Sequence, residues 1–158
     1  MEIKDKELHR ITTTTLVYKP GGIYLITKRA LHKKVMPGKW TIPGGGLSVD
    51  DYIHTPPSTT GALQWYGALE TSLRREIKEE VNLEIGKPEF LVDLTFIRPD
   101  GIPVICFSYY APYLSGEVVL DEDATEFAWV TLEQAKEYDL IDGIWDEIRQ
   151  VDEILKAK

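Results

Sequence analysis

Closely spaced acidic side chains are the clearest candidates for chemistry in this chain. Glu76, Glu79 and Glu80 form one short run. Residues three and four positions apart share a helix face, so these carboxylates would project together, one turn apart or less. Like charges at that spacing repel each other, whereas Mg²⁺ and Mn²⁺ are bound by carboxylate oxygens. Two interpretations follow from the residues alone: a solvated acidic face, or a divalent-cation site.

A helix over residues 69–83 is predicted to position these carboxylates. Leu69, Leu73, Ile77 and Val81 recur every four residues, which is typical of one buried stripe. Upstream, the segment from Trp40 to Leu47 reads as a short strand that runs into a glycine-rich turn. Glycines allow a backbone to approach another group closely, so this turn is a candidate for contact with the site.

Together, the glycine turn and the acidic helix resemble the Nudix box, as found in MutT-like proteins. That pattern runs Gly, five residues, Glu, seven residues, then Arg-Glu-aliphatic-x-Glu-Glu-x-Gly-aliphatic. The helical half is in register at Arg75, Glu76, Ile77, Glu79, Glu80 and Leu83. Asn82 replaces the late glycine, a mild change because Asn tolerates the left-handed conformation.

The first half of the box departs from the pattern. Counting back from Arg75 puts the box Glu on Gly67, and the glycines of the turn lie too far upstream. We therefore expect an inserted loop, at about residues 48–66, to interrupt the box. Another acid would then replace the box Glu, and the candidates are Asp50, Asp51 and Glu70. Glu70 also falls in the first helical turn, where the helix dipole favours an acid regardless of function.

The resemblance implies a fold and an activity. The fold is a Nudix-type α/β/α sandwich on a mixed β-sheet, and the chain forms one domain over residues 1–158. The activity is metal-dependent cleavage of the pyrophosphate in a nucleoside diphosphate linked to another group, either ADP-ribose-like or a nucleoside triphosphate. Mg²⁺ or Mn²⁺ would be held by Glu76, Glu79 and Glu80 together with a main-chain carbonyl at Gly45.

The remaining site residues follow from the same resemblance. Arg75 would orient the carboxylates rather than react. Asp123 or Glu126 would act as general base, with Glu122 as a neighbouring candidate. The residues expected to face the substrate are Arg29, Lys39, Gly45, Gly46 and Trp65. Trp65 has an alternative role as a packing residue beside the helix, and the inserted loop could form a lid or a contact between two copies.

Two other functions stay open at this stage. A non-catalytic nucleotide-binding or regulatory module would explain the missing box Glu, although the intact metal-binding glutamates argue against it. An isopentenyl-diphosphate isomerase shares the fold but needs a cysteine in its site. The single cysteine, Cys106, lies between Ile105 and Phe107 in an apparent core strand.

Composition limits the partners. The chain has 158 residues, 43% hydrophobic and 28% charged, which fits one soluble domain. Its net charge of -8 argues against general nucleic-acid binding and favours a small nucleotide-type substrate. The sequence has no long apolar run and no leader-like N-terminus, so we expect no membrane span and a cytoplasmic location. A homodimer stays open.

The order of elements completes the prediction. Strands are expected over residues 9–18, 23–27, 90–98 and 102–110, followed by a short strand that carries Trp129. Two helices should close the chain, the first capped by Thr131. The second carries a buried stripe at Ile144, Ile148, Val151 and Leu155.

Overall fold

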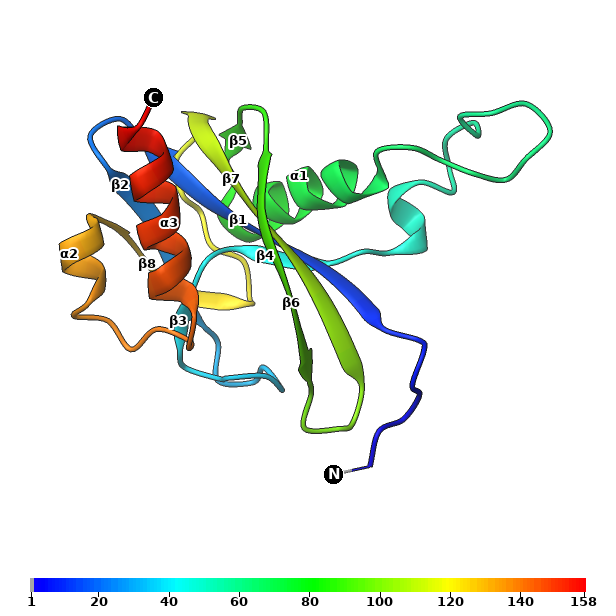
Figure 1. Ribbon diagram of the computed structural model, residues 1–158, viewed down its shortest axis with the longest axis horizontal. Helices are drawn as coiled ribbons and strands as arrows, with labels where there is room; N and C mark the ends of the chain where they lie inside the picture. Colours follow the sequence, from blue (N-terminus) through cyan, green and yellow to red (C-terminus); the bar gives the residue numbers. More distant parts are fainter. Residues whose placement is uncertain (1) are drawn as a thin grey trace.

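A mixed β-sheet lies between two helical layers in the computed structural model, which describes residues 2–158 (Figure 1). Helix α1 (Ala68–Val81) covers one face. Helix α3 (Ile144–Lys156) and the short α2 (Leu132–Ala135) cover the other. This arrangement confirms the predicted α/β/α sandwich. Among the described residues, no helix has both the length and the apolar character needed to cross a bilayer.

The central pair of strands runs parallel and the other pairs run antiparallel. β1 lies parallel to β7, so that Thr12 is level with Cys106 and Thr14 with Ser108. The strands are β1 (Arg10–Lys19), β2 (Ile23–Arg29), β3 (Trp40–Thr41), β4 (Gly44–Gly46), β5 (Glu84–Ile85), β6 (Glu89–Ile97), β7 (Pro103–Ser115) and β8 (Ala124–Val130). The predicted strands are confirmed with small shifts at their ends. β7 continues past Tyr110 because its far end pairs with β5.

A gap between β1 and β2 brings the glycine-rich segment into the sheet. β1 pairs with β2 only at Tyr18 and Lys19, and nearer its N-terminal end, at residues 12–14, it pairs with β4. The amide of Thr15 donates to the carbonyl of Pro43 at 2.9 Å, where the two pairings meet. The glycines of β4 are therefore held by backbone hydrogen bonds next to α1, rather than in a free loop.

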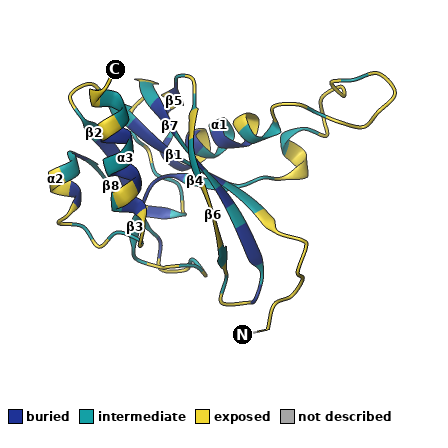
Figure 2. Ribbon diagram, viewed as in Figure 1, coloured by how far each residue is buried: buried dark blue, intermediate teal, exposed yellow. Residues whose placement is uncertain are grey.

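Alternation along β1 builds a core on each side of the sheet. Val17 packs with Leu73, Ile77 and Val81 of α1, while the adjacent Leu16 packs on the opposite face with residues of α3 such as Ile148 and Val151. Figure 2 shows this burial along β1, β2 and β7. Burying each such side chain contributes about 1.5–3 kcal/mol. Helix α1 is thereby fixed to a rigid sheet, which fixes the carboxylates that it carries.

The ends of α1 explain two departures from the box pattern. Gly67 precedes the helix with φ +79, a left-handed conformation that suits glycine. Asn82 ends it with φ 60, and its amide donates to the Lys78 carbonyl at 3.0 Å. Asn82 therefore takes the predicted role of the helix-ending glycine.

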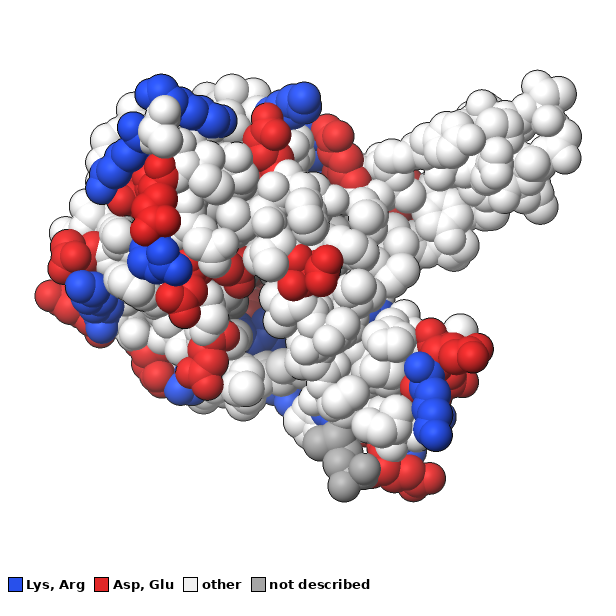
Figure 3. All heavy atoms as spheres, viewed as in Figure 1, with Lys and Arg blue, Asp and Glu red and all other residues white. Residues whose placement is uncertain are grey.

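The segment between β4 and α1 divides into two parts. Residues Val49–Asp51 form a short 3₁₀ helix, η1, capped by Ser48. Residues 52–66, which we call the arm, then project away from the body (Figure 1). The arm contains no Asp, Glu, Lys or Arg and is uniformly uncharged in Figure 3. The insertion is therefore shorter than predicted, because residues 48–51 remain next to the helix.

The C-terminal helices differ in size. Thr131 caps α2 through a reciprocal pair of hydrogen bonds with Gln134, as its position predicted. That helix spans only four residues, whereas α3 runs for thirteen and buries Ile144, Ile148 and Val151. α3 is the element that closes the second layer.

Candidate active site

Arg75 is the centre of the candidate site because its guanidinium joins both halves of the interrupted box. From α1 it donates through Nε and Nη2 to the two carboxylate oxygens of Asp51, the Nη2 contact measuring 3.1 Å. Nη2 also donates to the Gly46 carbonyl at 3.1 Å. Nη1 donates to Glu76 at 2.8 Å and to Glu79 at 3.0 Å. One planar cation thus fixes the glycine strand, η1 and the acidic face of α1.

Asp51 occupies the place that the pattern gives to the box Glu. Its side chain is only 1% exposed, and the Arg75 hydrogen bond lowers the pKa of its carboxyl. The other candidates lie elsewhere: Asp50 is 77% exposed beside His54, and Glu70 pairs with Arg74. Gly67, reached by counting back from Arg75, does not take this place, because the arm lies between Asp51 and the helix. Counting forward from Gly45 through five residues reaches Asp51, and this is the signal that identifies it in the sequence.

Glu76 packs directly on the glycine strand. A Cβ placed on Gly45 would lie 2.1 Å from the Glu76 Cδ, so no other residue fits at this position without moving the carboxylate. Burial raises the pKa of the Glu76 carboxyl, while the hydrogen bond from Arg75 opposes that shift. The close approach expected of the glycines is therefore an approach to an acid of α1.

Glu80 is the most deeply buried acid of the helix. It is 8% exposed, and the amide of Gly44 lies 3.5 Å from its Oε2. Burial raises the pKa of its carboxyl to about 8, assisted by the negative charges of Asp121, Glu76 and Asp123. Asp121 was not singled out in the sequence, although its backbone amide bonds to the Glu80 carbonyl at 3.1 Å. A cluster of acids this costly to bury is relieved by a bound cation.

The donor set fits a hard divalent cation. Carboxylates of Glu76 and Glu80 meet the carbonyl-bearing glycine strand, and oxygens of this kind are what Mg²⁺ and Mn²⁺ prefer. Glu79 differs from the other two because its side chain is 57% exposed, although Glu76 and Glu79 both accept a hydrogen bond from Arg75. Over residues 2–158, no three acidic, histidine or cysteine side chains already surround one point. Of the predicted three glutamates, Glu76 and Glu80 are therefore the ones that contact the glycine strand, and Glu79 is the exposed one.

The candidate bases separate in space. Asp123, which precedes β8, lies close enough to Glu76 and Glu80 to raise the pKa of both. Its carboxylate is 3.1 Å from Lys33 Nζ. Glu126 on β8 instead pairs with Lys28 at 2.8 Å, and Glu122 is exposed. The acidic loop thus contributes Asp121 and Asp123 to the cluster, and Glu126 lies in a surface ion pair.

The residues predicted to face the substrate also divide. Arg29 is half-buried, and burial lowers the pKa of its guanidinium against the opposing charges of Glu80 and Asp123, which places it near the acids. Lys39 instead pairs with Asp139 at 2.7 Å. Trp65 donates to the Thr55 carbonyl at 2.8 Å and packs on Tyr52.

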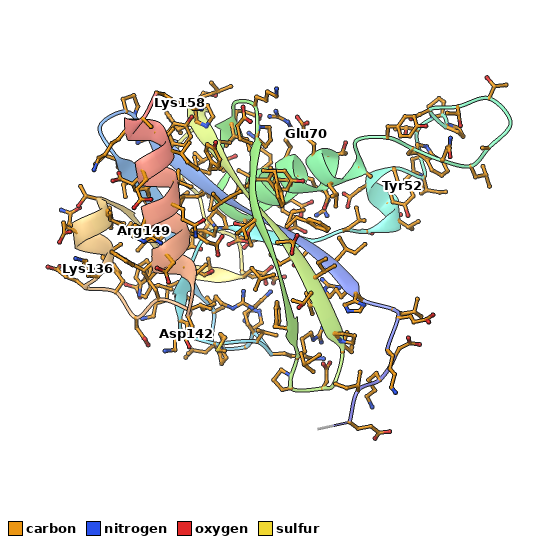
Figure 4. The ribbon with its side chains drawn as sticks, viewed as in Figure 1. Tyr52, Glu70, Lys136, Asp142, Arg149 and Lys158 are labelled. Carbon is orange, nitrogen blue, oxygen red and sulfur yellow. The ribbon has the colours of Figure 1, made fainter. Side chains whose placement is uncertain are left out.

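Trp65 and its contacts all belong to the arm. Figure 4 labels Tyr52 at the root of the arm, beyond the start of α1. In this arrangement Trp65 packs neither under the helix nor over the glycine strand. The expectation that the loop forms a wall or lid is therefore not met by the position that the arm adopts here.

Comparison with known proteins identifies the class. Residues 8–151 match the NUDIX domain, and the chain belongs to the Nudix hydrolase family, enzymes that act on phosphoric anhydrides and generally need a divalent metal. It is 30% identical over 129 residues to the nucleoside triphosphatase NudI of Klebsiella pneumoniae, a match spanning 75% of this chain and 80% of that protein. It is also 30% identical to an isopentenyl-diphosphate Δ-isomerase of Corynebacterium glutamicum, over 89% of this chain and 70% of that protein.

Solved structures agree on the fold. The MutT protein of Methanosarcina mazei superposes with a TM-score of 0.68 at 22% identity, covering 94% of this chain and 96% of that one. The NUDIX domain of Shewanella oneidensis NrtR, solved with ADP-ribose, gives 0.67 at 16% identity, covering 95% and 90%. At these identities the likeness concerns the fold alone.

Proposed function

We propose that this protein hydrolyses a phosphoric anhydride bond in a nucleotide, using Mg²⁺ or Mn²⁺. The substrate is a nucleoside triphosphate or a nucleoside diphosphate joined to another group. The observation that carries the proposal is the clamp of Arg75 on Asp51, the Gly46 carbonyl and Glu76. This clamp restores the box across its insertion, and the similarity to nucleoside triphosphatases supports the same reaction.

The roles of the residues follow from their surroundings. Glu76, Glu80 and the carbonyl side of Gly45 would hold the cation, with Glu79 released from Arg75 to join them. When bound, such a cation neutralises charge on the phosphates and lowers the pKa of a water. Arg75 and Asp51 hold the carboxylates in position, because two parallel hydrogen bonds fix a guanidinium in its plane.

Proton removal is assigned to Asp123. Both candidates are paired with a lysine, Asp123 with Lys33 and Glu126 with Lys28. Asp123 is the stronger candidate because its charge acts on Glu76 and Glu80. Arg29 supplies positive charge near the same acids and would contact the phosphates of the substrate. The proton acceptor, Asp123, would thus come from the segment before β8, and the phosphate contact, Arg29, from the end of β2.

Specific observations bear on two alternative functions. A binding-only module was suggested by the missing box Glu, and the presence of Asp51 at Arg75 removes that reason. The isomerase is suggested by the Corynebacterium relative. Cys106 is 6% exposed, and burial raises the pKa of its thiol, which disfavours the reactive thiolate. Hydrolysis is therefore the better supported function.

A nucleotide panel tests the proposal. Nucleoside triphosphates, nucleoside diphosphates and ADP-ribose-like compounds would be incubated with the protein in Mg²⁺ and in Mn²⁺, and the products resolved by phosphorus NMR in ¹⁸O-labelled water. We expect one class to be cleaved with ¹⁸O incorporated into a phosphate product. The proposal would be contradicted if the folded protein cleaved none of the compounds with either metal.

A further inference from the structure

A basic groove lies on the other side of the glycine strand from the carboxylates. Its volume is about 380 Å³, and its lining residues are His9, Arg10, Ile11, Leu47, Arg98 and Ile102. They come from the start of β1, the residue after β4, and the two ends of the β6–β7 turn. Neither the box nor the proposed mechanism uses this groove.

The cationic groups of the groove are incompletely neutralised. Within residues 2–158, Arg10 is the one arginine whose guanidinium has neither an ion pair nor a hydrogen bond. Arg98 pairs with Asp100 at 2.7 Å through Nη2, but its buried Nε has no acceptor. The Nε of Arg98 is a buried donor, and leaving such a donor unpaired is costly, so an anion that accepts from it would be stabilised. The guanidinium of Arg10 is exposed and can approach the same anion. In a protein of net charge -8, such a site is a local exception.

Gly46 connects this groove to the candidate active site. A Cβ on Gly46 would lie 2.3 Å from Arg10 Nη2, so the guanidinium lies against the bare backbone of β4. The carbonyl of the same residue accepts from Arg75. The adjacent Gly45 faces Glu76 on the opposite side. One strand of three residues therefore separates the basic groove from the acidic cluster.

We infer that Arg10 and Arg98 form a second anion site, which binds a phosphate group beside the cleavage site. Guanidinium donors match phosphate oxygens, and Arg10 and Arg98 line the groove together with the apolar Ile11, Leu47 and Ile102. The natural source of this phosphate is either a distal phosphate of the substrate, which rests on the proposed function, or free inorganic phosphate. The site would favour substrates that carry an anionic group beyond the bond that is cut.

Binding measured without turnover tests the site independently of hydrolysis. Pyrophosphate and inorganic phosphate would be titrated by calorimetry into metal-free wild-type protein, Arg10→Ala, Arg98→Lys and, as a matched control, Arg149→Ala. Arg149 pairs with Asp146 and Glu153 on exposed α3. We expect Arg10→Ala to weaken pyrophosphate binding by about tenfold or more, since a hydrogen bond to a charged group is lost, with the control unchanged.

Within residues 2–158 the Arg10 side chain makes no ion pair or hydrogen bond, so Arg10→Ala should fold normally, and the thermal midpoint Tm checks this. Equal pyrophosphate affinity in wild type and a folded Arg10→Ala would overturn the inference. Arg98→Lys keeps the charge but loses the fork of donors, and it should give an intermediate affinity.

Kinetics then distinguish the two sources. If the substrate supplies the phosphate, Arg10→Ala raises KM for a nucleoside triphosphate more than for the corresponding diphosphate. If free phosphate is the ligand, the KM values of Arg10→Ala equal those of the wild type. Added inorganic phosphate then changes the rate of the wild type but not that of Arg10→Ala. Either result supports the site. If no nucleotide is hydrolysed while pyrophosphate binding still depends on Arg10, the proposed function fails and the anion site stands.

Discussion

The carboxylate of Asp51 accepts two hydrogen bonds from the guanidinium of Arg75, although the arm separates the two residues along the chain. The side chain of Asp51 is almost fully buried in this pair. Arg75, held in place by Asp51, also donates hydrogen bonds to Glu76 and to the Gly46 carbonyl. The position of the acidic helix relative to the glycine strand therefore depends on Asp51, an aspartate outside the helix.

Replacing Asp51 should inactivate the enzyme without unfolding it. Asp51→Asn keeps the shape but removes the charge that orients Arg75, so we expect the catalytic efficiency kcat/KM to fall by about a hundredfold. Steady-state kinetics on the best nucleotide would measure this loss. Asp50→Asn, one residue away and 77% exposed, is the matched control and should retain activity. Equal activities in the two variants would remove Asp51 from the site.

Acid sensitivity gives a second test of the same pair. The pKa of Asp51 is lowered in the folded protein, so its contribution to stability is present at neutral pH. It is lost as the pH falls below the ordinary value of 3.8 and through the lowered pKa. The difference in unfolding free energy between wild type and Asp51→Asn should therefore shrink as the pH falls through this range. Urea unfolding at several pH values checks it, and a constant difference would be evidence against a charged pair.

A divalent cation should stabilise the fold through Glu80. Burying this carboxylate is costly, and a bound cation offsets the cost, so Mg²⁺ or Mn²⁺ should raise the Tm of the wild type. Glu80→Gln removes the charge, and we expect it to abolish the metal-induced shift and to lower the rate by at least about a hundredfold. Glu84→Gln, which alters an exposed acid paired with Lys78, serves as control. A full metal shift in Glu80→Gln would place the cation elsewhere.

Shortening the arm should leave catalysis and folding largely intact. Trp65 and Tyr52 pack on each other, and Leu63 and Tyr66 are 85% and 75% exposed. Replacing residues 53–66 with a short glycine-serine linker should therefore change KM and Tm little. Light scattering on the wild type and on the same variant tests for the homodimer that the sequence leaves open. A large rise in KM would restore the lid hypothesis, and a loss of dimer mass would assign the arm to the interface.

Glu147 should make stability depend on pH with the opposite sign from Asp51. This acid of α3 accepts a hydrogen bond from Ser108 in a buried site, and burial raises its pKa above the ordinary 4.5. The unfolded chain ionises first as the pH rises, so the native state loses relative stability above that value until the raised pKa is passed. Glu147→Gln should thus raise Tm at about pH 8 but hardly at about pH 4. Glu153→Gln, exposed on the same helix, is the control.

The sequence predicted best what depends on periodicity. The stripe of α1, the capping by Thr131 and the presence of the long strands all follow from local patterns, and each is present. The far end of β7 does not, because it depends on pairing with β5. The family and the fold followed from the helical half of the box. Lys39 and Glu126 show the limit of such reasoning, because an oppositely charged residue brought close by the fold engages each of them.

Asp121 and Arg10 could not be predicted as neighbours of the site. Asp121 reaches Glu80 through the turn before β8, and Arg10 reaches Gly46 because β4 fills the gap beside β1. The first relationship arises because the segment before β8 packs on the end of α1, and the second because β4 pairs with β1. Periodicity and motif spacing describe single segments, so they carry no information on this pairing.

The ion pair between Asp51 and Arg75 also makes the positions of the carboxylates independent of the length of the arm. Closing a flexible loop costs free energy that grows only slowly with length, about 0.6 kcal/mol for each doubling. Because Asp51, at one end of the arm, is held to Arg75 of α1, the helix that follows the other end, residues added within the arm would extend into solvent without displacing the carboxylates. The arm is thus a natural insertion point for a reporter domain, and we expect the size of the inserted domain to leave the geometry of the candidate site unchanged.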